Sequence, residues 1–542
     1  MTSLFSLRNM KFGELDAKNE IIKQYKQTSS IFYEAFLAPP HFDEAELLSG
    51  STFFIIGNKG TGKTALLRWL KRKIDDNDES ISELVLFKSH ITEEERTILS
   101  TQTGFSVVER DGKAFSIEQD FKQYWALYIH KTVALLLSQA IDQSRIPDSP
   151  EARRYISVFQ RNDSWWSRIS RILPMTADGS ADIKLNLDYI TASVNIALKP
   201  TAPRRYSSFT ELVDGINELL RRVPRSDTTI YVLFDELEVF FERTEQFDRD
   251  RRMLRDLMYA IVSFNATFLS AGPRVHVISA VRSEILNSIA KVGQEIVRDV
   301  YDYGYRIKWD VAFRNGNHPL LEIIENKIRL SYRERENADF KGDIWTAFFP
   351  PNLGSSMATK EDLVYSSLFR PRDIVRRLST ARDYDPSAGA FTQAAFDESR
   401  TQYSNGIWQE IYEELLASYS VEEIRTIERL FSGFYSFFFI EELVYRARQK
   451  FKDGDIAARI ATTSFISTAL DDLFQLGAVG NDFVARVQGR TNVRQRWVFR
   501  GSEDLVKDER MSVHRSLWKH FSTLDRKGIG KMEIFQGYDP HR

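Results

Sequence analysis

The sequence predicts an α/β fold: a parallel sheet covered by helices on both faces, followed by a helical region and a C-terminal hairpin. Between residues 51 and 309, short apolar segments alternate with helical segments, which is typical of a parallel sheet. From 319 to about 470 the pattern is mostly helical. Two β-leaning segments, 483–487 and 493–499, then flank Gly489 and indicate a hairpin. Short helices before such a hairpin predict a winged-helix-like end.

The individual elements follow from the spacing of apolar residues and from glycine and proline breaks. Strands are expected at 51–56, 83–88, 229–234, 275–280 and 305–309. Helices are expected at 14–37, where Pro39 and Pro40 follow, and at 65–73, 121–141, 209–222 and 245–264. The pattern loosens between about 100 and 205, where only the helix at 121–141 and a hairpin-like alternation at 181–198 stand out. We therefore expect an insertion there.

The length of 542 residues allows three or four domains at roughly 150 residues each. The predicted domains are a helical leader packed on the core (1–50), the core with its insertion (51–318), a helical lid subdomain (319–400), a winged-helix-like domain (401–524) and a C-terminal tail (525–542).

Composition excludes several classes of function. The 74 basic and 76 acidic residues nearly cancel, so a nucleic-acid site must be a local patch. The absence of cysteine removes disulfides, thiolate metal sites and cysteine nucleophiles. The eight histidines include no pair spaced to place two imidazoles on one helix face, which makes a zinc site improbable.

The chain is expected to be cytoplasmic and to have no membrane partner. Its N-terminus turns polar within the first dozen residues and lacks the apolar core of a signal peptide. The longest strongly apolar run, 434–440, is far shorter than the roughly 18 residues that span a bilayer.

Residues 57–64 match the phosphate-binding P-loop pattern in full, and they lie between a predicted strand and a predicted helix, as that pattern requires. The glycines let backbone N–H groups surround phosphates at the start of a helix. Lys63 would reach the β and γ phosphates, and the Thr64 hydroxyl would bind Mg²⁺. The expected nucleotide-binding residues are Gly57, Asn58, Lys59, Gly60, Thr61, Gly62, Lys63, Thr64 and Ala65.

The strand at 229–234 ends in two carboxylates, Asp235 and Glu236. Asp235 is placed to hold the magnesium ion, and Glu236 to orient and deprotonate an attacking water. The glutamate favours hydrolysis of the nucleotide. Guanine-binding proteins usually carry an Asn-Lys-x-Asp loop, which this chain lacks, so ATP is the expected nucleotide. An ordinary solvated strand end is the alternative interpretation.

Two further arginine-containing segments are expected near the phosphates. Ser279 would sense the γ-phosphate and Arg282 would stabilise charge there, because ligands bind at the carboxyl ends of parallel strands; a capping serine and a solvated arginine are the alternatives. Arg370 and Arg372, at the start of a predicted helix, would meet phosphate in cis or from a neighbouring subunit. A surface pair between arginine and Asp373 is equally compatible with the sequence.

Basic residues follow the predicted C-terminal hairpin. Arg494, Arg496 and Arg500 fall on one face of its second strand by period two, while Arg486 and Arg490 lie on the opposing arm and turn. This basic wing would follow a nucleic-acid backbone. A solvated outer face is the simpler interpretation.

With these residues in view, the chain resembles bacterial P-loop ATPases of the FunZ type, relatives of the origin-recognition, STAND and KAP groups of AAA+-like ATPases. The resemblance covers most of the chain. It rests on the leader Phe12-Gly13 with Asp16-Ala17 and Glu20, on the P-loop, on 235–238, on Arg282-Ser283-Glu284-Ile285, where the family has aspartate in place of Glu284, and on 370–374. It implies an ASCE-type sheet, a helical subdomain and a winged-helix-like end.

The expected function is that of a Mg²⁺-dependent ATPase acting as a conformational or assembly switch. The resemblance implies a homo-oligomer and a role in anti-phage defence with a separate effector protein. An ATP-dependent DNA-binding initiator or loader that uses the basic wing is the main alternative. A scaffold that binds ATP without hydrolysing it is a third hypothesis, against which Glu236 weighs, and a small-molecule kinase is the least favoured.

Overall fold

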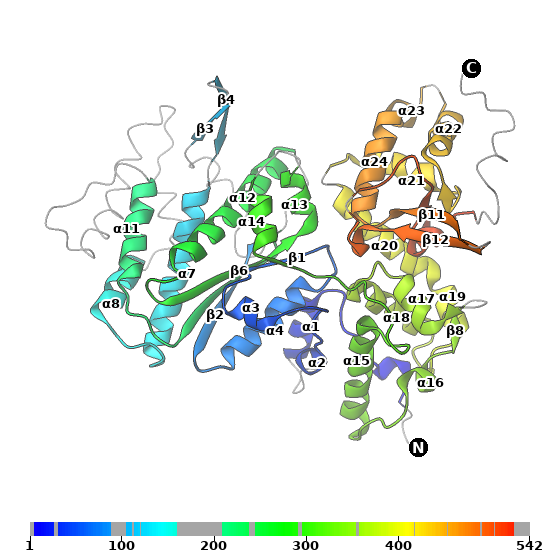
Figure 1. Ribbon diagram of the computed structural model, residues 1–542. Coiled ribbons are helices and arrows are strands. Elements are labelled where there is room, and N and C mark those ends of the chain that lie inside the picture. The colour runs from blue at the N-terminus through cyan, green and yellow to red at the C-terminus, as the bar shows by residue number, and fades with distance from the viewer. Residues whose placement is uncertain are drawn as a thin grey trace. The chain divides into compact units, whose positions relative to one another are not determined.

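The computed structural model (Figure 1) divides the chain into two compact units. The sheet unit comprises residues 41–57 and 63–307, and the terminal unit comprises 1–40, 58–62 and 308–542. The structure describes residues 5–25, 31–87, 105–110, 113–119, 121–159, 209–237, 244–290, 295–353, 357–416, 418–452, 454–487, 490–502 and 504–524. The predicted hairpin at 181–198 and the predicted tail at 525–542 lie outside these residues.

The sheet unit is built on five parallel strands in the order β2-β5-β6-β1-β7. Their bounds are β1 Phe54–Gly57, β2 Ser80–Leu86, β5 Thr229–Asp235, β6 Arg274–Arg282 and β7 Gly304–Arg306. Strands β1 and β5 are apolar and buried along nearly their whole length, as expected for strands covered on both faces. The predicted α/β fold with a parallel sheet is confirmed.

Helices cover both faces of this sheet. Helix α4 (Lys63–Asp75) follows β1 and packs on one face, and α7 (Lys122–Asp142) and α12 (Thr244–Thr267) pack together on the other (Figure 1). The remaining helices of the unit are α3 (Glu44–Leu48), α8 (Pro150–Ser157), α11 (Phe209–Arg221), α13 (Ser283–Ala290) and α14 (Ile296–Asp302). Strands β3 (Phe105–Arg110) and β4 (Lys113–Gln119) form a separate antiparallel pair. Helix α7 lies within the predicted insertion, yet it packs directly on β2 and β5.

The first part of the terminal unit is mainly helical. Its elements before residue 420 are a 3-10 helix at Leu7–Asn9, α1 (Ala17–Tyr25), α2 (Ile31–Glu34), α15 (Pro319–Glu336), α16 (Ile344–Phe348), α17 (Thr359–Tyr365), α18 (Pro371–Tyr384), α19 (Gln393–Glu398), α20 (Arg400–Leu415) and the short strands β8 (Asn352–Leu353) and β9 (Met357–Ala358). The leader is tied to α15 through a buried ion pair between Glu20 and Lys327, with 2.8 Å between Oε1 and Nζ.

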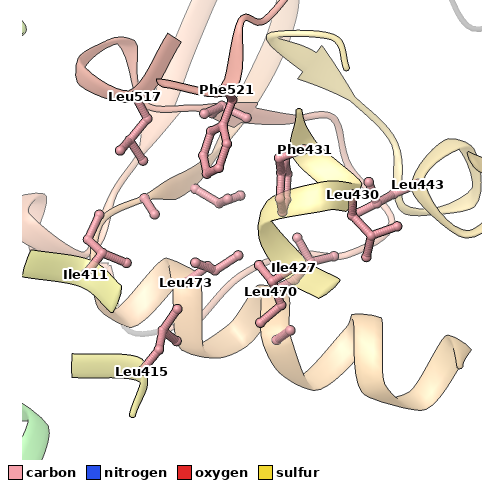
Figure 2. Packing of buried hydrophobic residues seen from close by; sticks show 14 of the residues in the cluster. Ile411, Leu415, Ile427, Leu430, Phe431, Leu443, Leu470, Leu473, Leu517 and Phe521 are labelled. Carbon is pink, nitrogen blue, oxygen red and sulfur yellow. The ribbon is translucent and has the colours of Figure 1, made fainter. Parts of the chain in front are cut away.

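The second part combines helices with a four-stranded sheet in the order β10-β13-β11-β12. Its elements are α21 (Val421–Phe431), β10 (Phe437–Phe438), α22 (Ile440–Lys450), α23 (Ile456–Ile460), α24 (Thr463–Gln475), β11 (Val479–Val487), β12 (Arg490–Arg496), β13 (Met511–Val513), α25 (Trp518–Phe521) and 3-10 helices at Val498–Arg500 and Arg515–Leu517. Figure 2 shows one core in which Ile411 of α20 packs with Ile427 and Leu473. Helix α20 therefore shares its core with the C-terminal elements.

The predicted C-terminal hairpin is present as the antiparallel pair β11 and β12, with Arg494 opposite Phe483. The prediction for Arg500 is wrong. Strand β12 ends at Arg496, and Arg500 lies in a 3-10 helix rather than on the strand face of Arg494 and Arg496. Across the described ranges, no helix combines the length and the apolar character needed to cross a membrane.

Candidate functional site

The carboxyl ends of neighbouring strands bring several of the sequence-predicted residues to one edge of the sheet unit. In the register of the sheet, Gly57 of β1 lies opposite Arg282 of β6, and Asp235 of β5 lies opposite Leu86 of β2. This is the edge at which open parallel sheets bind their ligands. Arg282 is therefore placed beside the start of the P-loop.

Ser279 lies elsewhere. It is paired with Phe54 and Phe234, one position before Asp235 in the register of β5 and β6. Because successive side chains of a strand point to opposite faces, Ser279 faces away from Asp235, and its buried hydroxyl has no partner among the described residues. The role of Ser279 at the γ-phosphate stays a prediction.

Thr64 and Asp235 meet at this edge. The Thr64 hydroxyl, in the first turn of α4, lies near enough to the Asp235 carboxylate to lower its pKa as a hydrogen-bond donor, and the positive charge of Lys63 acts in the same direction. The Lys63 ammonium is itself buried and donates to the Gly57 carbonyl at 2.6 Å. Lys63 and Thr64, the side chains that the sequence assigned to phosphate and metal, thus lie together at the helical end of the P-loop, next to Asp235.

Asp235 is an unusual carboxylate. Burial raises its pKa, while hydrogen bonds from the Glu236 backbone and Thr64 and the charge of Lys63 act in the opposite direction. Its second oxygen, Oδ2, is buried and has no hydrogen-bond partner among the described residues. A buried carboxylate oxygen without a donor is costly and is suited to a cation.

These residues fit a magnesium ion held together with a nucleotide. Mg²⁺ usually takes one or two protein oxygens and completes its shell with water and phosphate oxygens, and Thr64 with Asp235 supply such a pair. In the described part of the chain, no group of three or more histidine, aspartate or glutamate side chains is arranged to hold a metal ion.

Glu236 follows β5 in a left-handed backbone conformation, with φ of 56°. For a residue other than glycine this conformation costs roughly 1–2 kcal/mol, and such strain concentrates at functional sites. Glu236 is therefore held at the same sheet edge as the Thr64–Asp235 pair.

Loop residues 58–62 belong to the terminal unit, where three side chains hold them. Arg370 Nη1 donates to the Lys59 carbonyl at 3.1 Å, and Trp309 Nε1 donates to the Thr61 carbonyl at 2.9 Å. The Lys59 ammonium pairs with Glu413 at 3.0 Å. Gly60 has φ of +83°, and a Cβ added there would lie 3.2 Å from Cβ of Arg372, so the contact requires glycine.

Arg370 and Arg372 are both committed to partners. Arg370 is buried and pairs with Asp373 at 2.8 Å; burial alone would lower its pKa, yet Asp373 and Glu410 raise it above its ordinary value. Arg372 donates to the Leu15 carbonyl at 2.7 Å and lies 3.7 Å from Glu410. The predicted alternative, an Arg370–Asp373 pair, is present, but it is buried rather than on the surface.

The basic wing is only partly described. Arg494 is exposed and Arg496 half-buried on β12. The backbone of Arg486 lies opposite Thr491, and that of Arg490 opposite Val487; the side chains of 484–493 lie outside the description. Arg500 turns inward, with Nε 3.6 Å from Asp310 and its guanidinium 5.7 Å from the ring of Phe369.

Sequence reasoning missed Trp309, Glu410 and Glu413 as partners of the P-loop and its arginines. Each lies at least 34 positions along the sequence from the residue it contacts. Only the folded chain brings these residues together. Neither family models nor curated proteins yield a match for this chain. Its function has to be argued from its own residues.

Proposed function

We propose that this chain is a Mg²⁺-dependent ATPase whose nucleotide state drives a conformational or assembly switch. The observation that carries the proposal is the pair of Thr64 and Asp235, in which the Thr64 hydroxyl lowers the pKa of the carboxylate and Asp235 Oδ2 is buried and unpartnered among the described residues. Lys63 lies close enough to influence the pKa of this carboxylate. A hydroxyl, a carboxylate and a lysine at the end of a P-loop form a set suited to the phosphates and metal of ATP.

Each residue has a defined role in this proposal. Lys63 exchanges its bond to the neutral Gly57 carbonyl for charge-assisted bonds to phosphate oxygens, which are stronger. Thr64 and Asp235 hold the magnesium ion, which when bound neutralises charge on the phosphate oxygens. Glu236 orients the attacking water and accepts its proton. Arg282, opposite Gly57, stabilises negative charge at the same sheet edge.

The switch would act through the loop itself. The Lys59 and Thr61 carbonyls are held by Arg370 and Trp309 within the terminal unit. Residues 58–62 are covalently continuous with β1 and α4, so a loop that rearranges around phosphates must strain or remake these two hydrogen bonds. Nucleotide binding would thereby change the environment of α18.

The wider role follows from the resemblance to the FunZ type of P-loop ATPase. The order α21, β10, α22, α24, β11, β12 supports a winged-helix-like end. We place the protein with AAA+-like switches that form homo-oligomers, in a defence system with a separate effector.

The test is phosphate release and solution mass of the full chain with Mg²⁺ and ATP, with a non-hydrolysable analogue, and without nucleotide. Lys63→Ala is expected to lose ATP binding, and Glu236→Gln to keep binding while turnover falls by about 100-fold or more. Arg72→Gln, on the exposed end of α4, is the matched control and should behave like the wild type. Failure of the wild type to bind or hydrolyse ATP under these conditions would exclude the proposal.

A second candidate is an ATP-dependent DNA-binding loader, favoured by the exposed Arg494 on the confirmed hairpin. It predicts salt-sensitive DNA binding that weakens in Arg494→Glu and Arg496→Glu. DNA binding that these substitutions leave unchanged would count against it.

A further inference from the structure

A cationic cavity lies within the terminal unit, and the proposed ATPase mechanism makes no use of it. Its volume is about 70 Å³, room for several water molecules at roughly 10–15 Å³ each. Side chains from α18, α20 and the segment 515–519 line it, and they include Arg377, Arg400, Tyr403, Arg515, Trp518 and Lys519. None of the described lining residues is acidic.

Arg377 is the buried cation of this set. Only 1% of it is exposed, and its Nε and Nη1 atoms have no hydrogen-bond partner among the described residues. Its guanidinium lies over the rings of Phe396 and Tyr403, at 5.3 and 5.2 Å. These contacts offset part of the cost of burying a cation, but they satisfy no N–H group. A buried cation without an anion is one of the costliest features a fold can contain.

The charges around the cavity are unbalanced. Asp362, itself buried, accepts from Arg515 at 2.7 Å and lies 3.8 Å from Arg400. Asp362 also acts on Arg377, as does Asp397. Two carboxylates therefore stand against four cations, which are Arg377, Arg400, Arg515 and Lys519. The surplus is positive, so the cavity attracts an anion.

The walls of the cavity are fixed by the surrounding core. Leu517 and Phe521 are anchored in the cluster shown in Figure 2, which holds the intervening segment with Trp518 and Lys519 in place. Tyr403 donates to the Ser366 carbonyl at 2.7 Å, and the Trp518 indole donates to the Val513 carbonyl at 2.8 Å. A site whose side chains are already positioned loses little entropy when it binds.

We propose that this cavity binds the phosphate group of a small molecule. Arginine guanidinium groups match phosphate oxygens in planar, bidentate geometry, and three arginines with one lysine converge here. Trp518, which is 37% exposed at the rim, provides a ring against which the remainder of a nucleotide would stack. The bound phosphate supplies negative charge beside Arg377, whose Nε and Nη1 atoms are themselves buried.

The experiment separates this cavity from the P-loop by using the full chain carrying Lys63→Ala. Inorganic phosphate, ribose 5-phosphate and AMP are titrated by calorimetry at constant ionic strength in chloride. Saturable binding of at least one phosphate probe is expected. Lys519→Gln, which changes an exposed side chain, should weaken it about tenfold, the equivalent of ~1.4 kcal/mol.

Two further variants keep the result decisive. Arg377→Met should abolish binding, whereas Arg425→Gln, at an exposed arginine on α21, should leave it unchanged. Tighter binding of AMP than of inorganic phosphate, with the gain lost in Trp518→Ala, identifies a nucleotide as the ligand; equal binding identifies free phosphate. The proposal is overturned if no probe binds, or if Lys519→Gln and Arg377→Met bind as the parent does. Neither result bears on ATP hydrolysis by the chain with Lys63 intact.

Discussion

Arg370 is the N-cap residue of α18, and Arg377 lies two turns further along that helix. Both are buried, yet their surroundings are opposite. Arg370 pairs with Asp373 and donates to the Lys59 carbonyl, and its pKa lies above the ordinary value despite burial. Arg377 makes no such pair, and burial lowers its pKa to about 10. The difference teaches where to look for ligands: the fold gives Arg370 a hydrogen-bonded carboxylate, although its Nη2 atom has no partner among the described residues, and it gives Arg377 no such carboxylate.

The largest loss of stability is expected when Arg370 loses the carboxylate of Asp373. Asp373→Ala leaves Arg370 charged and buried without its hydrogen-bonded carboxylate, with only the longer-range charge of Glu410 and Glu414 remaining, so we expect a loss of about 3 kcal/mol in the free energy of unfolding. Urea denaturation measures this loss. Asp383→Ala, on an exposed position of the same helix, is the control and should change stability by less than about 0.5 kcal/mol.

A double variant sharpens the interpretation. Arg370→Met combined with Asp373→Leu removes both charges, and it should be more stable than Asp373→Ala alone because no unpaired ion remains. A double variant that is equally or more destabilised would show that packing, rather than the unpaired charge, dominates at this position.

His130 is a buried base that, unlike Arg370 and Arg377, can avoid the cost of burial by losing its proton. It is fully buried in α7, hydrogen-bonded to Asn217 and Tyr155, and burial lowers its pKa from 6.5 to about 4. The unfolded chain therefore binds more protons than the folded chain between these pH values, and stability falls as the pH falls through this window. We expect the wild type to lose about 3 kcal/mol more than His130→Gln between pH 7 and pH 4, at ~1.4 kcal/mol per unit.

Denaturation at several pH values measures that difference. His41→Gln, at an exposed histidine of the same unit, should follow the wild-type profile. Parallel profiles for wild type and His130→Gln would mean that His130 is not the group that titrates.

The sequence predicted the parts of the site that are local in the chain. The strand, loop and helix around 57–64 and the strand ending at Asp235 form where their apolar spacing and glycines predict, and the fold then joins Thr64 to Asp235. The face of the sheet that Ser279 occupies could not be predicted, because it depends on the register between strands, which a single strand does not reveal. Arg500 was misplaced because the period-two pattern continues beyond Arg496, where the strand ends.

Contacts between distant segments could not be predicted in this way. Arg370 and the Lys59 carbonyl are 311 positions apart, and the four cations of the cavity come from positions 377 to 519 without any repeating pattern. A charge imbalance of this kind becomes visible only after the chain has folded. The unpaired arginine, rather than a motif, is what marks the second site.

The smallest expected effect concerns Arg377 itself. Without ligand, Arg377→Met removes an unsatisfied cation but keeps an apolar side chain against Phe396 and Tyr403, so the loss of cation–π contacts and the relief of desolvation nearly cancel. We expect a change of less than about 1 kcal/mol in the free energy of unfolding, measured in phosphate-free buffer. A loss as large as that of Asp373→Ala would mean that the fold already satisfies Arg377, and the contrast between the two arginines would disappear.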